Sequence, residues 1–291
     1  MSSLPSFNAS AVEVDRRAAL GFGLAATALM AWPAQGKAAL RQLDPANADD
    51  ARLIYRKLRY RTDSGLLFSW IKGPYMAAIA GDLIPMYAIN LGSFQRVTQR
   101  PDGGFDLVDL EISFRTDVET GERLTRFRNP VTGETVPVVA RPQGPNRLTV
   151  SRENEVQISD LPGGPHFDHV HYPVRPFTLG KEIVIRDRSH ARVTAPDGGI
   201  SMLNEVSTIS APAVQVLDPA TTSVETRVQS NDVRSWPAWL NMGDRPGHLA
   251  LFGNGGKVNR FEDLPEDWRQ MLKEVFPDIA ANPIAALDRK G

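Results

Sequence analysis

The chain lacks cysteine altogether and carries almost no net charge, with 33 basic and 34 acidic residues. Without cysteine, the protein forms no disulfide bond and has no thiol nucleophile or cysteine-ligated metal. The balanced charge gives no sign of the basic surface that binds nucleic acid, so we expect no nucleic-acid partner. No apolar run in the body of the chain reaches the roughly 20 residues that cross a bilayer. Walker and dinucleotide glycine motifs are absent as well.

What is present begins with an N-terminal segment that has the three-part layout of a secretory signal. A polar stretch leads to Arg16 and Arg17, then to a mildly apolar segment at residues 20–32, and then to small residues. Gly36 and Ala38 suit the −3 and −1 positions of a signal-peptidase site. The paired arginines, with a leucine shortly after them, are similar to a twin-arginine (Tat) signal.

We therefore interpret residues 1–38 as a Tat-type signal peptide and residues 39–291 as one mature domain. The Tat export machinery is then a partner, and the periplasm is the expected location. No stable membrane anchor is expected after cleavage. A helix packed on the domain is the alternative interpretation of the same segment. The mature chain is long enough to bury a core of its own.

Most of the mature chain has the pattern of short β-strands. Between residues 65 and 253, runs rich in Val, Ile, Thr, Phe and Tyr alternate with Gly, Pro, Asp and Asn. The turn sequence PDGG occurs at residues 101–104 and again at 196–199. This spacing predicts a mainly β domain of antiparallel strands, either barrel-like (calycin-like) or a sandwich. The pattern contains no βαβ alternation, which argues against a Rossmann-like fold.

Helical patterns occur only near the two ends of the mature chain. Residues 44–61 predict a short N-terminal helix that Asp44 or Asn47 could cap. A second helix begins near Pro265, has acidic residues in its first turn and apolar residues at helical spacing, and ends at Pro277. We expect this C-terminal helix to cover one end or one side of the sheet.

Several stretches of the sequence resemble a known bacterial family. They are YRKLRYRTDSGLLFSWIKG, ISFRTDVETGERLTRFRNPVTGETVPV and the tail WPAWLNMG…GHLALFGNGGKV…LPEDWR. Together they resemble the domain of unknown function 1838 family, and the most specific piece is the stretch with two TGE motifs and Asn129-Pro130. The resemblance covers most of the mature chain and implies a single β-rich domain, often with a Tat-type leader. It implies no reaction and no catalytic residues.

The densest chemical signal is GGPHFDHVHYP at residues 163–173, which holds three of the five histidines. In a strand, alternate side chains share a face, so His169 and His171 point the same way, together with Phe167. His166 follows a proline and lies at the strand entrance or in the turn before it. All three imidazoles therefore cannot meet at one point on a regular strand.

A His-x-His pair on one strand can offer two ligands to zinc or iron. A catalytic metal site needs a third ligand, and Glu111, Asp187 and His190 are the available types. Each has a plainer interpretation: Glu111 shares its face with other polar residues and can be solvated. His190 lies among arginines, which disfavour a cation.

A metal-free acid–base site is our working hypothesis, because imidazole titrates near neutral pH. His169 or His171 would be the base, and Tyr172, Asp168 or Arg175 would orient it or hold an anionic group. Histidines that merely hydrogen-bond at a strand end remain the structural alternative.

A barrel of this size can hold a cavity lined by a few aromatic side chains. Phe167, Trp70, Tyr87 and Glu111 are the candidate ligand-binding residues. The sequence thus predicts an exported protein that binds an apolar or aromatic small molecule, as a lyase or isomerase that needs no cofactor. A His-ligated metalloenzyme and a non-catalytic binding protein are the two alternatives.

Overall fold

The computed structural model describes residues 41–158, 166–172 and 174–289. The predicted signal peptide at residues 1–38 lies outside the described residues, as do residues 163–165 before the histidines. Residues from 40 onward belong to a single unit of the chain. No helix of the described residues is long and apolar enough to cross a membrane.

Strands make up most of this unit. The longer ones are β1 (Gly65–Ile79), β2 (Asp82–Gln99), β3 (Phe105–Thr116), β6 (Pro142–Val150), β8 (His166–Tyr172), β10 (Glu182–Thr194), β11 (Ile200–Pro212), β12 (Thr226–Arg234) and β13 (His248–Val258). The short ones are β4 (Arg126–Arg128), β5 (Thr135–Pro137), β7 (Val156–Ile158) and β9 (Phe177–Leu179). The helices are α1 (Ala48–Arg59), α2 (Ala213–Val216), α3 (Glu266–Val275), α4 (Pro277–Ala281) and α5 (Pro283–Ala286), with 3₁₀ turns η1 (Ala238–Leu240) and η2 (Phe261–Asp263).

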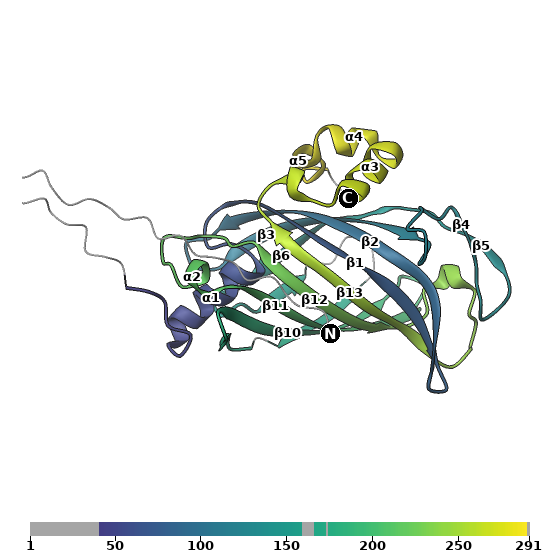
Figure 1. Ribbon diagram of the computed structural model, residues 1–291, viewed down its shortest axis with the longest axis horizontal. Coiled ribbons are helices and arrows are strands. Elements are labelled where there is room, and N and C mark those ends of the chain that lie inside the picture. The colour runs from purple at the N-terminus through teal and green to yellow at the C-terminus, as the bar shows by residue number, and fades with distance from the viewer. Residues whose placement is uncertain (1–40, 159–165, 173, 290–291) are drawn as a thin grey trace, which may run out of the picture. The chain divides into compact units, whose positions relative to one another are not determined.

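Ten of the described strands form one antiparallel sheet in the order β7-β6-β3-β2-β1-β13-β12-β11-β10-β8, and β9 pairs with β10 beside it. The sheet curls on itself, and its edge strands β7 and β8 lie close together without a described ladder between them. The result is a nearly closed barrel, drawn in Figure 1. The prediction of an antiparallel barrel with helices at the N- and C-terminal ends is confirmed, and the sandwich alternative is not.

The repeated PDGG sequence forms the same turn twice. It joins β2 to β3 and again β10 to β11. The third residue of each turn, Gly103 or Gly198, has a φ of 84° or 85°, a left-handed conformation that glycine adopts without a Cβ clash. The motif therefore sets the register of two of the long hairpins.

Helix α1 closes one end of the barrel. Its N-terminus is capped by Asn47, whose side chain accepts from the backbone of Asp49 and Asp50. On its inner side, Ile54 and Leu58 are fully buried in a cluster with residues of several strands. Burying these apolar side chains at this end of the barrel removes both from water and holds the helix in place.

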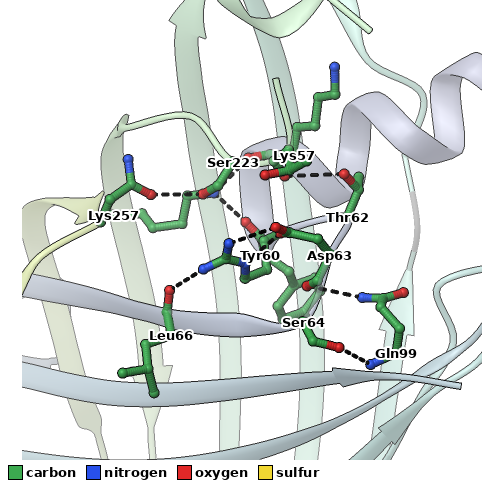
Figure 2. Close-up of polar contacts among 12 residues, drawn as sticks. Lys57, Tyr60, Thr62, Asp63, Ser64, Leu66, Gln99, Ser223 and Lys257 are labelled. Atoms are coloured by element: carbon green, nitrogen blue, oxygen red, sulfur yellow. Dashed lines mark hydrogen bonds and ion pairs between the residues drawn. The ribbon is translucent and has the colours of Figure 1, made fainter. Parts of the chain in front are cut away.

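A buried lysine attaches the C-terminal end of α1 to the barrel wall (Figure 2). Lys257 of β13 donates through Nζ to the backbone carbonyl of Lys57 at 2.6 Å and to that of Tyr60. These are carbonyl groups that the end of a helix leaves without partners. Burial lowers the pKa of Lys257 well below its ordinary value, because the charged form loses its hydration.

Helices α3, α4 and α5 cover the outer face of the barrel over β1, β2 and β3 (Figure 1). Trp268 of α3 is fully buried, and its ring packs against Phe94 and Phe114 with centroids 5.7 and 6.4 Å away. Its indole N–H donates to the carbonyl oxygen of Ile112 at 3.1 Å. Gly92 leaves the space for this ring, since a Cβ there would lie 2.4 Å from it.

Candidate functional site

The inside of the barrel has a polar middle between two apolar ends. One end is the α1 cluster, and the other is a cluster that includes Tyr75, Met86, Tyr87, Phe127, Leu240 and Leu249. A cavity of about 140 Å³, here called the histidine cavity, is lined by residues that include Arg59, Asp109, His169, His171, Asp187 and Glu205. A cavity of about 310 Å³, here called the tyrosine cavity, is lined by residues that include Tyr75, Tyr87, Glu111, Arg115, Glu205, Asp232, Arg234 and Trp239. Glu205 lines both cavities, so they adjoin.

Strand β3 explains why polar side chains face inward. Its side chains alternate between the two faces of the sheet, and those of Leu110, Ile112 and Phe114 are buried on the outer face under the C-terminal helices. The other face presents Asp109 and Glu111 to the cavities. The sequence left Glu111 either solvated or lining a ligand cavity, and in the structure it lines the tyrosine cavity.

His171 is held by a buried hydrogen-bonding cluster. Its Nε2 contacts the Oδ1 atom of Asp187 and lies 2.9 Å from the hydroxyl of Tyr55, which also donates to Asp187 at 3.0 Å. Arg59 adds an ion pair to the other carboxylate oxygen, with Nε 3.2 Å from Oδ2. The side chains of His171 and Asp187 are only 6% and 8% exposed, so solvent scarcely competes for these contacts.

The charge of Asp187 determines which nitrogen of His171 carries a proton. Burial raises the pKa of Asp187, but the hydrogen bonds from His171 and Tyr55 and the charge of Arg59 outweigh it and leave the pKa below its ordinary value. The carboxylate therefore accepts, and the single proton of the Tyr55 hydroxyl already points to it. Nε2 of His171 must then be a donor, so that in the uncharged form of the ring Nδ1 is the lone-pair atom. That Nδ1 atom is buried and has no hydrogen-bond partner among the described residues.

His169 lines the same cavity two positions earlier on β8. Burial lowers the pKa of His169, and the charges of His171 and Arg59 lower it further, so the uncharged ring is favoured at neutral pH. Its Nδ1 atom is likewise buried without a partner in the described part of the chain. The two imidazoles therefore bring two unsatisfied ring nitrogens to one cavity.

Three further carboxyl groups, those of Asp109, Glu205 and Glu111, line the two cavities. Asp109 accepts from Ser93 and from Gln95, the latter at 2.9 Å. Glu205 accepts from the hydroxyls of Ser207 at 2.6 Å and Ser230 at 3.0 Å.

Glu111, the third of these groups, makes no hydrogen bond or ion pair with any residue that the structure describes. Burial, together with the charge of Asp109, raises the pKa of Glu111 to about 7. Near neutral pH this side chain is therefore divided between its acid and its carboxylate forms, which suits a proton donor.

Comparison with known proteins identifies part of this barrel. Residues 199–291 match the model of a family described as a protein of unknown function (DUF1838). No curated protein and no solved structure gives a significant match. The match contains β11 to β13, Glu205 and the C-terminal helices, whereas β3, β8 and β10 precede it. Of the stretches that resemble the family in sequence, those at residues 55–73 and 112–138 lie outside the matched segment.

The structure brings four of the predicted site residues to the interior. His169 and His171 line the histidine cavity, and Tyr87 and Glu111 line the tyrosine cavity. Phe167 is partly buried and precedes the two histidines on the same face of β8.

Three predicted site residues do not join them. Tyr172 is 43% exposed on the outer face of β8, where the guanidinium of Arg188 lies 4.8 Å from its ring. Trp70 packs outside the barrel with the C-terminal helix cluster. Arg175 lines a separate surface cavity beside α1, which includes the ring of Tyr55. Strand alternation separates Tyr172 from the histidines, and Pro173, which follows it, lies outside the described residues.

Sequence reasoning missed Tyr55, Arg59 and Glu205 as site residues. Tyr55 lies within the predicted N-terminal helix, and its hydroxyl reaches Asp187 of strand β10. Arg59 belongs to the last turn of the same helix. Glu205 gave only the weak signal of a charged residue two positions before a serine in a strand pattern.

Within the described ranges, no group of three or more His, Asp or Glu side chains is arranged to hold a metal ion. Of the third-ligand types considered, Asp187 contacts His171 but also Tyr55 and Arg59. His190 instead contacts Asn204, with Nδ1 2.7 Å from the amide oxygen. The geometry thus offers hydrogen-bonding and proton-transfer groups rather than a ligand set.

Proposed function

We propose that the protein binds a small molecule inside the barrel and moves a proton on it with its own side chains, as a lyase or isomerase does. The observation that carries this proposal is the buried His171–Asp187 pair, whose free Nδ1 atom adjoins a cavity. An imidazole held from one side by a carboxylate is a common general base, because its orientation and tautomer are set in advance.

A proton donor is available in the adjoining cavity. Glu111 has a pKa of about 7, whereas that of His169 is lowered from its ordinary value. A buried carboxylic acid whose pKa lies near neutral can donate a proton at the working pH, and an uncharged imidazole can accept one. In this scheme His171 takes the proton, Glu111 returns one, and Asp187 and Tyr55 orient the base.

The cavity linings support a ligand with both apolar and polar parts. Tyr87 and Trp239 supply aromatic surface in the tyrosine cavity, and carboxyl and guanidinium groups share the same space. This lining is more polar than the lining that would suit the wholly apolar or aromatic ligand predicted from the sequence. A small molecule with an apolar or aromatic body and a hydrogen-bonding group fits it better.

The location also remains a proposal. The ordered polar, apolar and small-residue layout of residues 1–38, with Arg16-Arg17 before the apolar part, supports Tat-dependent export to the periplasm.

Hydrogen exchange on carbon tests the reaction even though the product is unidentified. The mature protein is incubated in D₂O with a panel of small carbonyl and hydroxy compounds that carry an acidic C–H, and ¹H NMR follows each C–H signal. A lyase or isomerase of this kind should exchange or transform at least one compound at a catalytic rate. If compounds bind but no C–H signal ever changes, the protein is a non-catalytic binding protein.

A further inference from the structure

A third cavity opens to the surface at the end of the barrel opposite α1. It has a volume of about 460 Å³ and lies where β5, the start of β6 and η1 meet. Val139 on its rim is 60% exposed, and Arg141 and Gln143 are exposed as well. We call it the mouth cavity.

The mouth cavity leads toward the histidines. Arg115, Gln143 and Trp239 line both the mouth cavity and the tyrosine cavity. Glu205 in turn lines both the tyrosine and the histidine cavities. Shared walls therefore link the surface, through two adjoining spaces, to the ring nitrogens of the site proposed above.

The cations along this route differ in whether they already have a partner. Inside, Arg59 pairs with Asp187, and Arg234 pairs with Asp232 at 2.6 Å. At the mouth, neither Arg115 nor Arg141 forms an ion pair with any carboxylate of the described residues.

Arg115 instead stands over the ring of Trp239, with 5.7 Å from its guanidinium carbon to the ring centroid. The indole N–H of that tryptophan is buried and has no acceptor in the described part of the chain. Arg115 also donates to the backbone carbonyl of Ser113 at 3.5 Å. Two guanidinium groups without a carboxylate partner and one unpaired indole N–H thus lie together at the mouth, within the described residues.

The carboxyl groups have the opposite distribution. Asp109, Glu111 and Glu205 face the interior, and none of them forms an ion pair with a described arginine or lysine. A negatively charged group that moved past Trp239 toward the histidine cavity would leave Arg141 and then Arg115 and approach Asp109 and Glu205. Coulomb repulsion opposes that move. An anionic group is therefore favoured at the mouth and disfavoured inside.

We propose that the substrate of the site described above is an amphiphilic anion, which Arg115 and Arg141 bind by its carboxylate or phosphate group at the mouth. Its uncharged body then passes Trp239 and reaches the histidine cavity. The remaining wall of the mouth suits such a body, because Pro137, Val139 and Ala238 are apolar. This inference rests on the proposed function for the site, but the anion-binding mouth has a test of its own.

The test is calorimetric titration of the mature protein with three probes that share an eight-carbon chain: octanoate, octyl phosphate and octan-1-ol. The two anions should bind at one site, and the alcohol should bind at least about tenfold more weakly, because it cannot make charge-assisted hydrogen bonds. Arg115→Met and Arg141→Met should each weaken octanoate binding about tenfold and leave binding of the alcohol unchanged.

Arg126→Met is the matched control, because Arg126 is exposed in β4 near the same end and lines none of the three cavities. Arg141 is itself exposed, so Arg141→Met should fold normally and can still test anion binding if Arg115→Met unfolds the protein. Equal affinity for octanoate and octan-1-ol, arginine variants that bind like the control variant, or no octanoate binding at millimolar concentration would each overturn the anion-binding mouth.

His171→Gln separates this inference from the proposed function. Octanoate binding to this variant should still depend on Arg115 and Arg141, since His171 lies outside the mouth. Arginine-dependent anion binding without any proton transfer would leave the mouth intact and refute the catalytic function. Proton transfer on a neutral or cationic compound, at a rate that Arg141→Met does not change, would support the catalytic function and refute the anionic substrate.

Discussion

His171 of β8 and Asp187 of β10 are hydrogen-bonded inside the barrel, 16 residues apart in the chain and both nearly inaccessible to solvent. The pair depends on α1 as well, since Tyr55 and Arg59 of that helix contact the same carboxylate. The helix that closes the barrel thus also supports the ring that faces the cavity. Stability and chemistry are coupled at this point.

Asp187→Asn should therefore destabilise the protein. The substitution leaves the Arg59 guanidinium without its carboxylate and weakens the hydrogen bonds from His171 and Tyr55. We expect the free energy of unfolding in urea at pH 7 to fall by about 2 kcal/mol, less than for a fully buried pair, because Arg59 is 39% exposed.

The pH dependence and a control make this prediction specific. Folding lowers the pKa of Asp187 below its ordinary value of 3.8, so the wild-type advantage is present above pH 3.8 and is lost as the pH falls through the folded-state pKa. Asp168→Asn, on the outer face with its side chain 59% exposed, should change stability by less than about 0.5 kcal/mol. Equal effects of the two substitutions would contradict a stabilising role for the buried pair.

His171→Gln should abolish most of the catalysis. Glutamine keeps hydrogen-bonding capacity but cannot accept a proton, so turnover should drop by roughly a hundredfold or more, the scale of losing a general base. His169→Gln should lower turnover too, if its ring serves as a second acceptor. His166→Gln is the matched control from the exposed face of the same strand. Initial rates of C–H exchange provide the measurement, and undiminished rates in His171→Gln would exclude it as the base.

Glu111→Gln should change the pH dependence of stability. Folding raises the pKa of Glu111 from 4.5 to about 7, so the folded state holds this proton more tightly than the unfolded state. Stability from this group is present below pH 4.5 and is lost as the pH rises to about 7. At 1.36 kcal/mol per pKa unit, the loss amounts to about 3 kcal/mol at most.

The glutamine variant has no proton to lose, so it should gain stability relative to the wild type across that pH range. Unfolding in urea at pH 4.5, 6 and 7.5 measures the difference. Glu119→Gln, on an exposed turn after β3, should follow the wild type throughout. If the stability of Glu111→Gln also followed that of the wild type at all three pH values, the Glu111 carboxyl group would have its ordinary pKa in the folded protein.

Replacing Arg16 and Arg17 together by lysine should block export. The Tat machinery requires the twin arginines, whereas lysine keeps the charge and the general character of a secretory signal. Cell fractionation with immunoblotting should find the wild-type protein in the periplasm, beginning soon after residue 38, and the variant retained uncleaved. Unchanged periplasmic accumulation of the variant would reject a Tat signal.

Local patterns in the sequence predicted much of the fold correctly. Both PDGG turns join neighbouring strands, and the alternation of HFDHVHY places His169 and His171 together and Tyr172 opposite. The C-terminal helix ends before Pro277 as predicted, and two further short helices follow it. These features depend on contacts within a few residues, where backbone geometry and side-chain period leave few alternatives.

The face of β3 shows where local pattern was insufficient. Alternation correctly separates Leu110, Ile112 and Phe114 from Asp109 and Glu111, but it does not say which face lies inside the barrel. The covering helices α3 to α5 bury the apolar face from outside, so the polar face becomes the cavity wall. A strand covered on its outer side reverses the usual rule that apolar residues point to the centre of a barrel.

The sequence by itself determined the strand pattern, the turns, the helices at the two ends of the domain and the shared face of His169 and His171, because these follow from neighbouring residues. Only the tertiary structure decided that this face is internal, that Tyr55, Arg59 and Asp187 meet His171, and that Glu111 lies in a cavity. Those relationships arise when the sheet curls and α1 closes it, which brings together residues as far as 132 positions apart in the chain. The alternation of polar and apolar residues along a strand does not determine this closure, because the same alternation occurs whichever face of the strand lies inside the barrel.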